Sequence, residues 1–305
     1  MPTQRPKKVD STSREAQQFY QSYSVAEDKR RTNLHYEQPV DFFYRVTGGE
    51  WNVYSCNLWH TARTDSESQQ AKLDLFAELM QLREGQRILD VGCGWGGPLV
   101  YLSKTYGVRG VGLTLSSLQK RAADERAARH GVDVQVFERH WRDFRDEEGF
   151  DAVYTDEVIV HFQDLGDFFS RVHSWLHDGG RMLNKELHFT HSRYTRDLTR
   201  IQSFVNEIYG ATGNYRVLAE ELTLLEQADF ELERLVEIPP EHYMKTVDRW
   251  ISNMRQHKEE LVSLVGREYF RRFLTYLTIT RRYIVTGETM GLHVVVGRKP
   301  AMTSA

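Results

Sequence analysis

The sequence predicts an α/β fold with a seven-stranded, mostly parallel sheet and helices on both faces. Three observations lead to this prediction. Short apolar runs alternate with helical stretches from Arg87 to Leu187, and the first run ends at a glycine-rich turn. Of the 305 residues, 40% are hydrophobic and 27% are charged, as in ordinary globular proteins. Strands that alternate with helices form βαβ units, and these units place their strands in parallel.

Before the first strand, helices are expected at residues 14–33, 41–46 and 64–80. The last of these has the clearest apolar face, with Asp65 or Ser66 as its N-cap. The first has a ragged apolar face and follows a polar tail. Residues 1–33 are therefore assigned to a tail and an extension helix, and residues 34–300 to a single domain.

The central part alternates strands and helices, and the last part adds further segments. Strands are expected at 87–91, 110–113, 134–137, 150–154, 181–187, 230–238 and 293–296, and helices at 98–106, 116–130, 168–176, 218–228, 243–265 and 268–285. Helical lid segments are expected at about 190–225 and 240–286. Such additions to an α/β sheet cover the carboxyl ends of its strands, where ligands bind.

Residues 88–97 read Ile-Leu-Asp-Val-Gly-Cys-Gly-Trp-Gly-Gly and carry the strongest motif. An apolar strand reaches Asp90, and the glycines that follow open a helix. Glycines let the backbone approach a ligand closely, and a helix N-terminus favours a carboxylate. The Asp90 carboxylate can hold an ammonium group. A ligand with both groups, like an amino acid, therefore fits better than a pyrophosphate, whose motif has another glycine spacing.

This strand–turn–helix motif resembles motif I of the class I S-adenosylmethionine-dependent methyltransferases. The resemblance implies a Rossmann-like fold, S-adenosyl-L-methionine as methyl donor and S-adenosyl-L-homocysteine as product. Residues 112–116, Gly-Leu-Thr-Leu-Ser, resemble the second-strand motif of the cyclopropane fatty acid synthase group, and the similarity runs from about residue 34 to residue 298. It implies cofactor binding by Tyr36, Tyr54, Ser55, Asp90, Gly92, Gly94, Thr114, Leu115, Gln119, His140, Trp141 and Asp156.

Trp141 follows the third strand, where this family holds the adenine, and its ring can stack on that base. The group has an acidic residue next to an aromatic one here, whereas this chain has the pair His140-Trp141. The contact to the adenine amino group is therefore left open by the sequence.

The segment after the fourth strand indicates the substrate class. Cyclopropane synthases have a Glu before the His of this segment, which helps to hold bicarbonate, but this chain has Val160 before His161. A His of their fifth strand is also replaced, by Lys185 or Glu186. A bicarbonate-dependent cyclopropanation is therefore not expected. The segment is more similar to sterol C-24 methyltransferases and geranyl diphosphate C-methyltransferases, whose acidic residue aligns with Glu157.

Those enzymes methylate an alkene carbon of an isoprenoid. The π bond attacks the methyl group and leaves a carbocation, which a carboxylate stabilises or deprotonates and aromatic rings shield. The resemblance implies catalytic roles for Glu157, His161 and Tyr276. Aromatic residues of the added segments and strand ends are expected to contact the substrate, namely Tyr20, Tyr23, Trp59, Phe162, Tyr194, Tyr209 and Tyr283.

The expected function is C-methylation of an alkene carbon in an isoprenoid or prenylated natural product, such as a prenylated indole alkaloid of the teleocidin type. The resulting cation can cyclise or lose a proton. Two alternatives stay open: methylation of a fatty acyl chain, and N-methylation of a small molecule. The chain has no paired-Asp motif of the DDxxD type. We therefore expect no metal site and a small apolar substrate.

Composition argues against other classes of function. The net charge of −3 is unlike that of a general nucleic-acid binder, and no run approaches the roughly 18 apolar residues of a membrane span. Two cysteines, Cys56 and Cys93, cannot form a disulfide framework, so a cytoplasmic location is expected. The aromatic N-terminal helix is expected either to contact a neighbouring subunit of a homo-oligomer or to close over the methyl donor.

Overall fold

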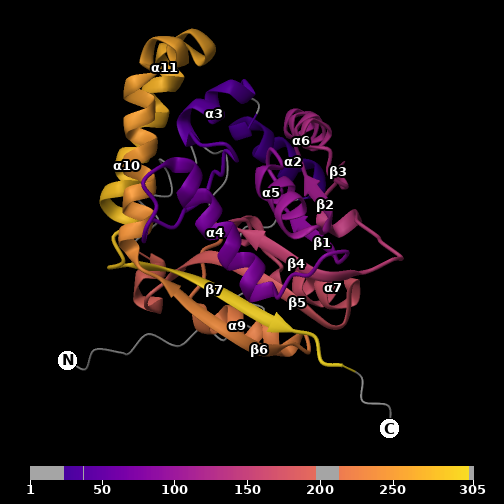
Figure 1. The fold of residues 1–305 in the computed structure, drawn as a ribbon. Coiled ribbons are helices and arrows are strands. Elements are labelled where there is room, and N and C mark those ends of the chain that lie inside the picture. Colours follow the sequence, from indigo (N-terminus) through magenta and orange to yellow (C-terminus); the bar gives the residue numbers. More distant parts are fainter. Residues whose placement is uncertain (1–23, 37, 197–212, 302–305) are drawn as a thin grey trace, which may run out of the picture.

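The computed structural model describes residues 24–36, 38–196 and 213–301, and it confirms the predicted α/β architecture (Figure 1). A seven-stranded sheet runs in the order β3-β2-β1-β4-β5-β7-β6. Its strands are β1 (Arg87–Val91), β2 (Arg109–Thr114), β3 (Val134–Glu138), β4 (Phe150–Asp156), β5 (Leu176–Phe189), β6 (Glu231–Ile238) and β7 (Met290–Arg298). The first five are parallel, and β7 is antiparallel to both β5 and β6.

Helices cover both faces of this sheet. They are α2 (Val25–Tyr36), α3 (Val40–Thr47), α4 (Asp65–Met80), α5 (Gly97–Tyr106), α6 (Ser117–His130), α7 (Leu165–Trp175), α9 (Leu218–Gln227), α10 (Pro240–Gln256) and α11 (Lys258–Ile279). One apolar core joins α4 and α5 to the sheet, with Phe76 and Tyr154 fully buried. A second core lies under α7 and α9, with Phe168 and Phe169 fully buried. Burial of apolar side chains on both faces is what a parallel sheet requires.

Helices α3, α10 and α11 pack against one another at one end of the molecule (Figure 1). The Tyr243 hydroxyl of α10 donates a hydrogen bond to Glu157, which directly follows β4. This group of helices therefore reaches the carboxyl end of the central strands. Helix α9 lies elsewhere, because it packs on α7 and β6.

Three predicted element ends need correction. The N-cap of α4 is Thr64, because its side chain accepts a hydrogen bond from Glu67 N while the Glu67 carboxylate accepts one from Thr64 N. This reciprocal arrangement satisfies two backbone donors, which neither Asp65 nor Ser66 achieves. Helix α10 ends at Gln256 and not at the predicted residue 265, whereas the predicted break at Gly266 is present as a kink inside α11, where this glycine has a non-helical φ of 81° and ψ of 157°. Strand β5 spans Leu176–Phe189, so it begins earlier and ends later than the predicted strand at 181–187.

Two glycines let the turn after β1 lie close to its neighbours. Gly92 has φ 90°, and a Cβ atom on it would lie 2.6 Å from the Val158 side chain. A Cβ atom on Gly97 would lie 1.7 Å from the Trp51 carbonyl oxygen. Since only glycine fits both positions, the turn brings together the carboxyl end of β1, the turn after β4 and the segment around residues 51–56.

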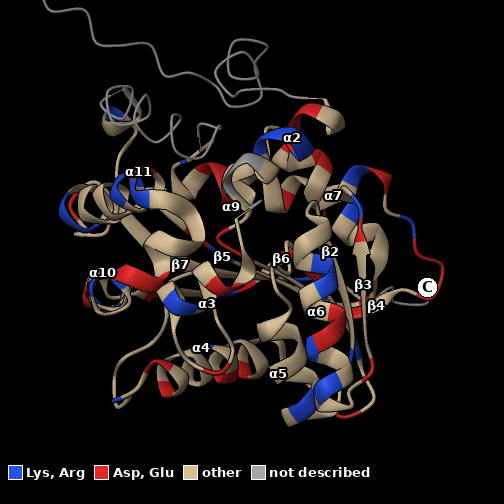
Figure 2. Cartoon of the chain, turned by 90° about the horizontal axis from the view of Figure 1, so that it is seen from above, with Lys and Arg blue, Asp and Glu red and all other residues tan. Residues whose placement is uncertain are grey.

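Charged residues of both signs are mixed on the helices. Figure 2 shows Lys and Arg beside Asp and Glu on α2, α6 and α10. Some of these pairs join elements, as Arg45 of α3 does with Glu260 of α11, at 2.8 Å. Among the described residues, no helix combines the length and the apolar character that crossing a bilayer requires.

Candidate functional site

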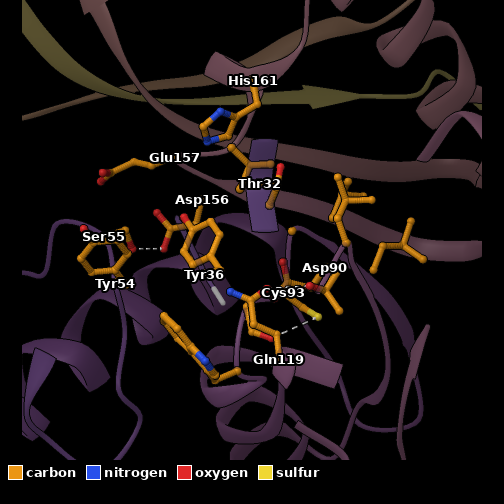
Figure 3. Close-up of a pocket in the computed structure, with 18 of the residues that line it drawn as sticks. Thr32, Tyr36, Tyr54, Ser55, Asp90, Cys93, Gln119, Asp156, Glu157 and His161 are labelled. Atoms are coloured by element: carbon orange, nitrogen blue, oxygen red, sulfur yellow. Dashed lines mark hydrogen bonds between the residues drawn. The ribbon is translucent and has the colours of Figure 1, made fainter. Parts of the chain in front are cut away.

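A pocket lies at the carboxyl ends of β1, β2 and β4, and α2 supplies part of its wall (Figure 3). Residues predicted to bind the cofactor come together here from six separate parts of the chain. All twelve line the pocket: Tyr36, Tyr54, Ser55, Asp90, Gly92, Gly94, Thr114, Leu115, Gln119, His140, Trp141 and Asp156. The predicted catalytic residues Glu157 and His161 and the predicted substrate residue Phe162 also line it.

Asp90 ends in the pocket as a buried carboxyl group, only 3% exposed. The Tyr154 hydroxyl donates a hydrogen bond to its Oδ2 at 2.7 Å. Burial raises the pKa of Asp90 to about 7, although the Tyr154 hydrogen bond acts in the opposite direction. The free pocket therefore disfavours the carboxylate form, and a ligand that presents an ammonium group or hydroxyl donors would restore it.

The end of β2 is held by a side-chain hydrogen bond across the start of α6. Thr114 Oγ1 donates to Gln119 Oε1 at 2.6 Å. The Ser116 hydroxyl caps α6 by accepting from Gln119 N. The first contact holds the Gln119 side chain, which lines the pocket at a position where the resemblance implies cofactor binding.

The loop after β3 forms an aromatic wall. The Trp141 ring lies 5.4 Å from the Phe162 ring and 5.3 Å from the Phe168 ring, centroid to centroid. Its indole Nε1 is buried, with no hydrogen-bond partner among the described residues. Trp141 is thus a packed core residue whose ring also borders the pocket, a position compatible with stacking on an adenine.

The carboxyl end of β4 carries a buried cluster of four charges, formed by Lys72, Asp156, Glu157 and Lys185. Lys72 Nζ lies 2.5 Å from Asp156 Oδ2. Lys185 Nζ bridges the two carboxylates, at 2.6 Å from Asp156 Oδ1 and 2.5 Å from Glu157 Oε1. Ser55 Oγ donates to Asp156 Oδ2 at 2.6 Å (Figure 3). The two cations and two anions balance, so the cluster has no net charge.

The pKa values of these groups follow from burial and pairing. Burial alone would raise the pKa of Asp156, but Lys185 and Lys72 outweigh it and hold that pKa at about 2. Burial would also lower the pKa of Lys185, but Asp156 and Glu157 raise it above its usual value. In Lys72 burial prevails and lowers the pKa. Asp156 therefore stays ionised beside a pocket that suits a cationic ligand.

Glu157, like Asp156, is held by three donors. Its Oε1 accepts from Cys56 N at 2.8 Å and from Lys185 Nζ, and its Oε2 accepts from the Tyr243 hydroxyl. Its backbone φ of 59° lies in the left-handed region, which non-glycine residues rarely adopt. Strained backbone of this kind clusters at functional sites, because the surroundings must hold it in place.

Two residues that contact the carboxylates of the cluster, Lys72 and Tyr243, are not predicted from the sequence. Lys72 is fully buried on the apolar face of α4, and a lysine inside an apolar helical stripe is the signal that could have pointed to it. Tyr243 lies on α10, 86 positions from Glu157, and nothing in the local sequence links the two. The structure also separates the two candidates of the fifth strand, since Lys185 joins the cluster and Glu186 accepts instead from Val160 N and Leu187 N.

Several predicted residues lie away from the pocket lining. Trp59 Nε1 donates to Thr246 Oγ1 at 2.9 Å, which turns the ring toward α10. Tyr194 packs against the first apolar core, and Tyr283 is 50% exposed. Tyr276 is half-buried on α11 and, after desolvation, is the next cause of the raised pKa of Tyr36, so it lies near the pocket wall without lining it. The other predicted contacts, Tyr20, Tyr23 and Tyr209, are outside the described residues.

Comparisons with known proteins agree with the fold and the pocket. Residues 23–293 match the family model described as mycolic acid cyclopropane synthetase. The cyclopropane mycolic acid synthase MmaA2 of Mycobacterium tuberculosis is 31% identical over 264 residues, which cover 80% of this chain and 88% of that protein. The S-adenosylmethionine-dependent methyltransferase UmaA of the same organism is 29% identical over 251 residues, 78% of this chain and 87% of that protein.

Solved structures show the same likeness. The MmaA2 structure has a TM-score of 0.82 at 25% identity and covers 89% of this chain and 98% of its own. The structure of the mycolic acid cyclopropane synthase CmaA1 with S-adenosylhomocysteine (SAH) and CTAB gives the same values. The [4+2]-cyclase SpnF has a TM-score of 0.75 at 18% identity, covers 90% of this chain and 97% of its own, and shares the fold alone.

The pocket suits the cofactor that these relatives carry. Asp90 is a buried acid that a cationic or hydroxyl-bearing ligand would restore to its charged form, and the glycine turn after β1 leaves room beside it. A Cβ atom on Gly94 would meet no atom within 4 Å, so the backbone there is open to a ligand. With S-adenosyl-L-methionine as its cofactor, the chain is a methyltransferase and belongs to the mycolic acid cyclopropane synthetase family.

Proposed function

We propose that the enzyme methylates an alkene carbon of an apolar isoprenoid or prenylated natural product. The observation that carries this proposal is the carboxylate of Glu157, which borders the pocket and is held by Lys185, Cys56 N and Tyr243. A cation that forms on the acceptor beside this group would be stabilised by a fixed negative charge. An amine or a hydroxyl acceptor forms no carbocation, so stabilisation of a carbocation by this carboxylate applies to an alkene acceptor alone.

The cofactor supplies an electrophilic methyl group on a sulfonium. The enzyme's residues position the reactants around it. We infer that Asp90 and the glycine turn after β1 bind the amino-acid and ribose parts, and that the adenine lies against Trp141. Asp156, kept ionised by Lys72 and Lys185, offsets positive charge in the pocket. Tyr36 and Tyr54 line the same pocket and help to exclude water from a developing cation.

Aromatic rings near Glu157 support the same proposal. Three tyrosines, the buried Tyr243 and the partly buried Tyr36 and Tyr215, each have a pKa raised by desolvation and, in smaller part, by Glu157 and Tyr276. These phenols therefore lie within electrostatic range of one carboxylate. Their ring faces can stabilise a cation through cation–π interactions, and they add no strong nucleophile that would capture it.

The arrangement does not favour a reaction that depends on added bicarbonate. The donors that could bind a small carboxylate-like anion, Cys56 N, the Tyr243 hydroxyl and Lys185 Nζ, already hold the chain's own Glu157 carboxylate. Val160 has no polar group to add to such a site. Glu157 would therefore serve as a built-in anion in this enzyme.

Methylation of a fatty acyl chain remains the second candidate. The observation in its favour is the similarity to acyl-modifying relatives, which include MmaA2 and a probable fatty acid methyltransferase of Mycobacterium tuberculosis, Rv3720, at 30% identity over 270 residues. That relative is longer, and the match spans 60% of it and 85% of this chain.

One experiment separates the candidates. The purified enzyme is incubated with methyl-labelled cofactor and three sets of acceptors: prenylated indoles and other terpenoids, unsaturated acyl lipids, and small amines. We expect label only in the first set, attached to a former alkene carbon, as determined by NMR of the product. Label in acyl lipids alone would favour the second candidate, and label on nitrogen alone would contradict both.

A further inference from the structure

We propose that Asp28 of α2 binds the cofactor's adenine by accepting a hydrogen bond from its exocyclic amino group. The proposal rests on the placement of the adenine against Trp141 that belongs to the proposed function. The sequence leaves open which residue contacts the adenine amino group, because Trp141 is preceded by His140 and not by an acidic residue. Asp28 would supply that contact.

Asp28 and His140 contact each other in the wall of the pocket. His140 Nε2 lies 3.3 Å from Asp28 Oδ2, and both residues line the pocket. His140 Nδ1 accepts a hydrogen bond from Arg142 N at 3.0 Å, so the neutral ring carries its proton on Nε2 and donates it to Asp28. The His140 side chain is 3% exposed and that of Asp28 is 20% exposed. A buried imidazole thus orients a carboxylate that is only partly exposed.

This hydrogen bond uses Asp28 Oδ2, and within the described part of the chain no hydrogen bond reaches Oδ1, so that oxygen can accept one from a ligand. Adenine presents its amino group as a donor beside ring nitrogens that only accept hydrogen bonds. The cations at this wall, Arg142 at 5.0 Å and Arg171 at 5.8 Å from the Trp141 ring, are donors and cannot accept from that amino group. A carboxylate at the same wall supplies the missing acceptor.

The other carboxylates that line the pocket have different positions and partners. Asp90 ends β1 and binds Tyr154, whereas Asp156 and Glu157 belong to the lysine cluster at the end of β4. Asp28 is the one carboxylate among the described lining residues that contacts the loop after β3. Its position on α2 also means that adenine binding would hold this helix against the pocket.

The test compares two ligands that differ at the base. SAH carries adenine, and S-inosyl-L-homocysteine carries hypoxanthine, which has a carbonyl oxygen in place of the amino group. Their dissociation constants are measured by calorimetry for the wild type and for Asp28→Asn. An asparagine keeps the shape of the side chain but can donate to the carbonyl, so it reduces the repulsion that a carboxylate imposes on that oxygen.

We expect Asp28→Asn to weaken SAH binding about tenfold. We also expect it to reduce the preference for adenine over hypoxanthine about fivefold or more. Lys29→Gln is the matched control, because it cuts another contact of α2, the ion pair of Lys29 with Glu138, at a residue that does not line the pocket. This control should leave the preference between the two bases unchanged, even if both ligands bind more weakly.

An unchanged preference in Asp28→Asn would overturn the inference, as would an equal loss for both ligands. A third variant, Trp141→Leu, tests separately whether the adenine lies against Trp141, so that an error in this placement can be told apart from an error in the Asp28 contact. If Trp141→Leu leaves SAH affinity intact, the adenine lies elsewhere and the placement itself is wrong. Circular dichroism confirms that each variant is folded, and Asp28→Ala, which should lose the preference too, serves if Asp28→Asn is unstable.

Discussion

Glu157 and Lys185 are joined twice, once through their side chains and once through their backbones. Lys185 Nζ lies 2.5 Å from Glu157 Oε1, and Glu157 N donates to the Lys185 carbonyl oxygen at 2.7 Å. Together these contacts hold a residue with φ 59° at the end of β4. The fifth strand thereby fixes both the position and the charge of the carboxylate that follows the fourth.

Loss of the lysine should destabilise the fold. Lys185→Met removes the cation that serves Asp156 and Glu157 and leaves two buried carboxylates with Lys72 alone. Breaking a buried ion pair from one side typically costs about 3–5 kcal/mol. We expect a loss of that order in the free energy of unfolding, measured by urea denaturation near pH 7.

A double variant tests whether the pair is the cause. Lys185→Met combined with Glu157→Gln removes one of the two stranded charges, so it should be more stable than the sum of the single losses predicts. A coupling of about 1 kcal/mol or more is expected for residues in direct contact. Strict additivity would mean that Lys185 acts through packing and not through its charge.

Removal of the Glu157 charge should affect turnover more than binding. Glu157→Gln keeps the size of the side chain but removes the negative charge next to the acceptor. We expect kcat to fall about 10²-fold or more, with SAH affinity within about threefold of the wild type. Asp248→Asn is the matched control on α10, because this exposed carboxylate pairs with Arg281 outside the pocket. Near-normal turnover in Glu157→Gln would contradict the role proposed for this residue.

The enzyme should not respond to bicarbonate. Because Glu157 occupies the donors of Cys56 N, Tyr243 and Lys185, methylation rates in CO₂-free buffer should match those after bicarbonate is added back. Rates are compared at constant pH and ionic strength, with chloride as the control anion. A stimulation of several fold that is specific to bicarbonate would show that the anion has a binding site here and would remove an argument against the acyl alternative.

The sequence predicts this fold well because its strongest signals are local. The glycine turn after Asp90 and the apolar runs around it determine β1, α5 and the ends of the neighbouring strands, and these place the predicted cofactor residues in one pocket. The break predicted at Gly266 is present as a non-helical kink in α11, because glycine adopts a positive φ without strain. The further break at His257 has no glycine or proline to signal it, so the sequence does not predict it.

The charge cluster is harder to predict because it depends on contacts between distant segments. Lys72, Asp156 and Lys185 lie on three elements, and Tyr243 joins them from a fourth. Each residue alone is compatible with a solvated or merely structural position. For the aromatic residues, distant contacts instead remove a predicted site residue. Trp59 is of a suitable type to contact the substrate, but its hydrogen bond to Thr246 directs it toward α10.

Asp90 makes cofactor binding depend on pH. Its pKa is about 7 in the free pocket because it is buried, whereas a bound ammonium group or hydroxyl donors favour the ionised form. SAH affinity should therefore increase about tenfold per unit as the pH rises from 5.5 toward 7 and then level off. Calorimetry in two buffers of different ionisation enthalpy should detect proton release on binding below pH 7. Asp90→Asn should bind more weakly and lose this dependence, and a flat profile in the wild type would contradict the assignment.

The same group makes the stability of the cofactor-free enzyme depend on pH in the opposite sense. A carboxyl group has a pKa of about 3.9 in the unfolded chain, and burial raises that of Asp90 to about 7 in the folded state. Its contribution to stability is therefore fully present below the unfolded pKa and is lost as the pH rises through 7. Asp90→Asn has no such penalty, so its stability relative to the wild type should improve by about 2–3 kcal/mol between pH 5 and pH 8. Urea denaturation of both proteins at the two pH values measures this difference. A constant difference would show that the folded enzyme ionises Asp90 without penalty, and the pH dependence expected for SAH binding would then need another cause.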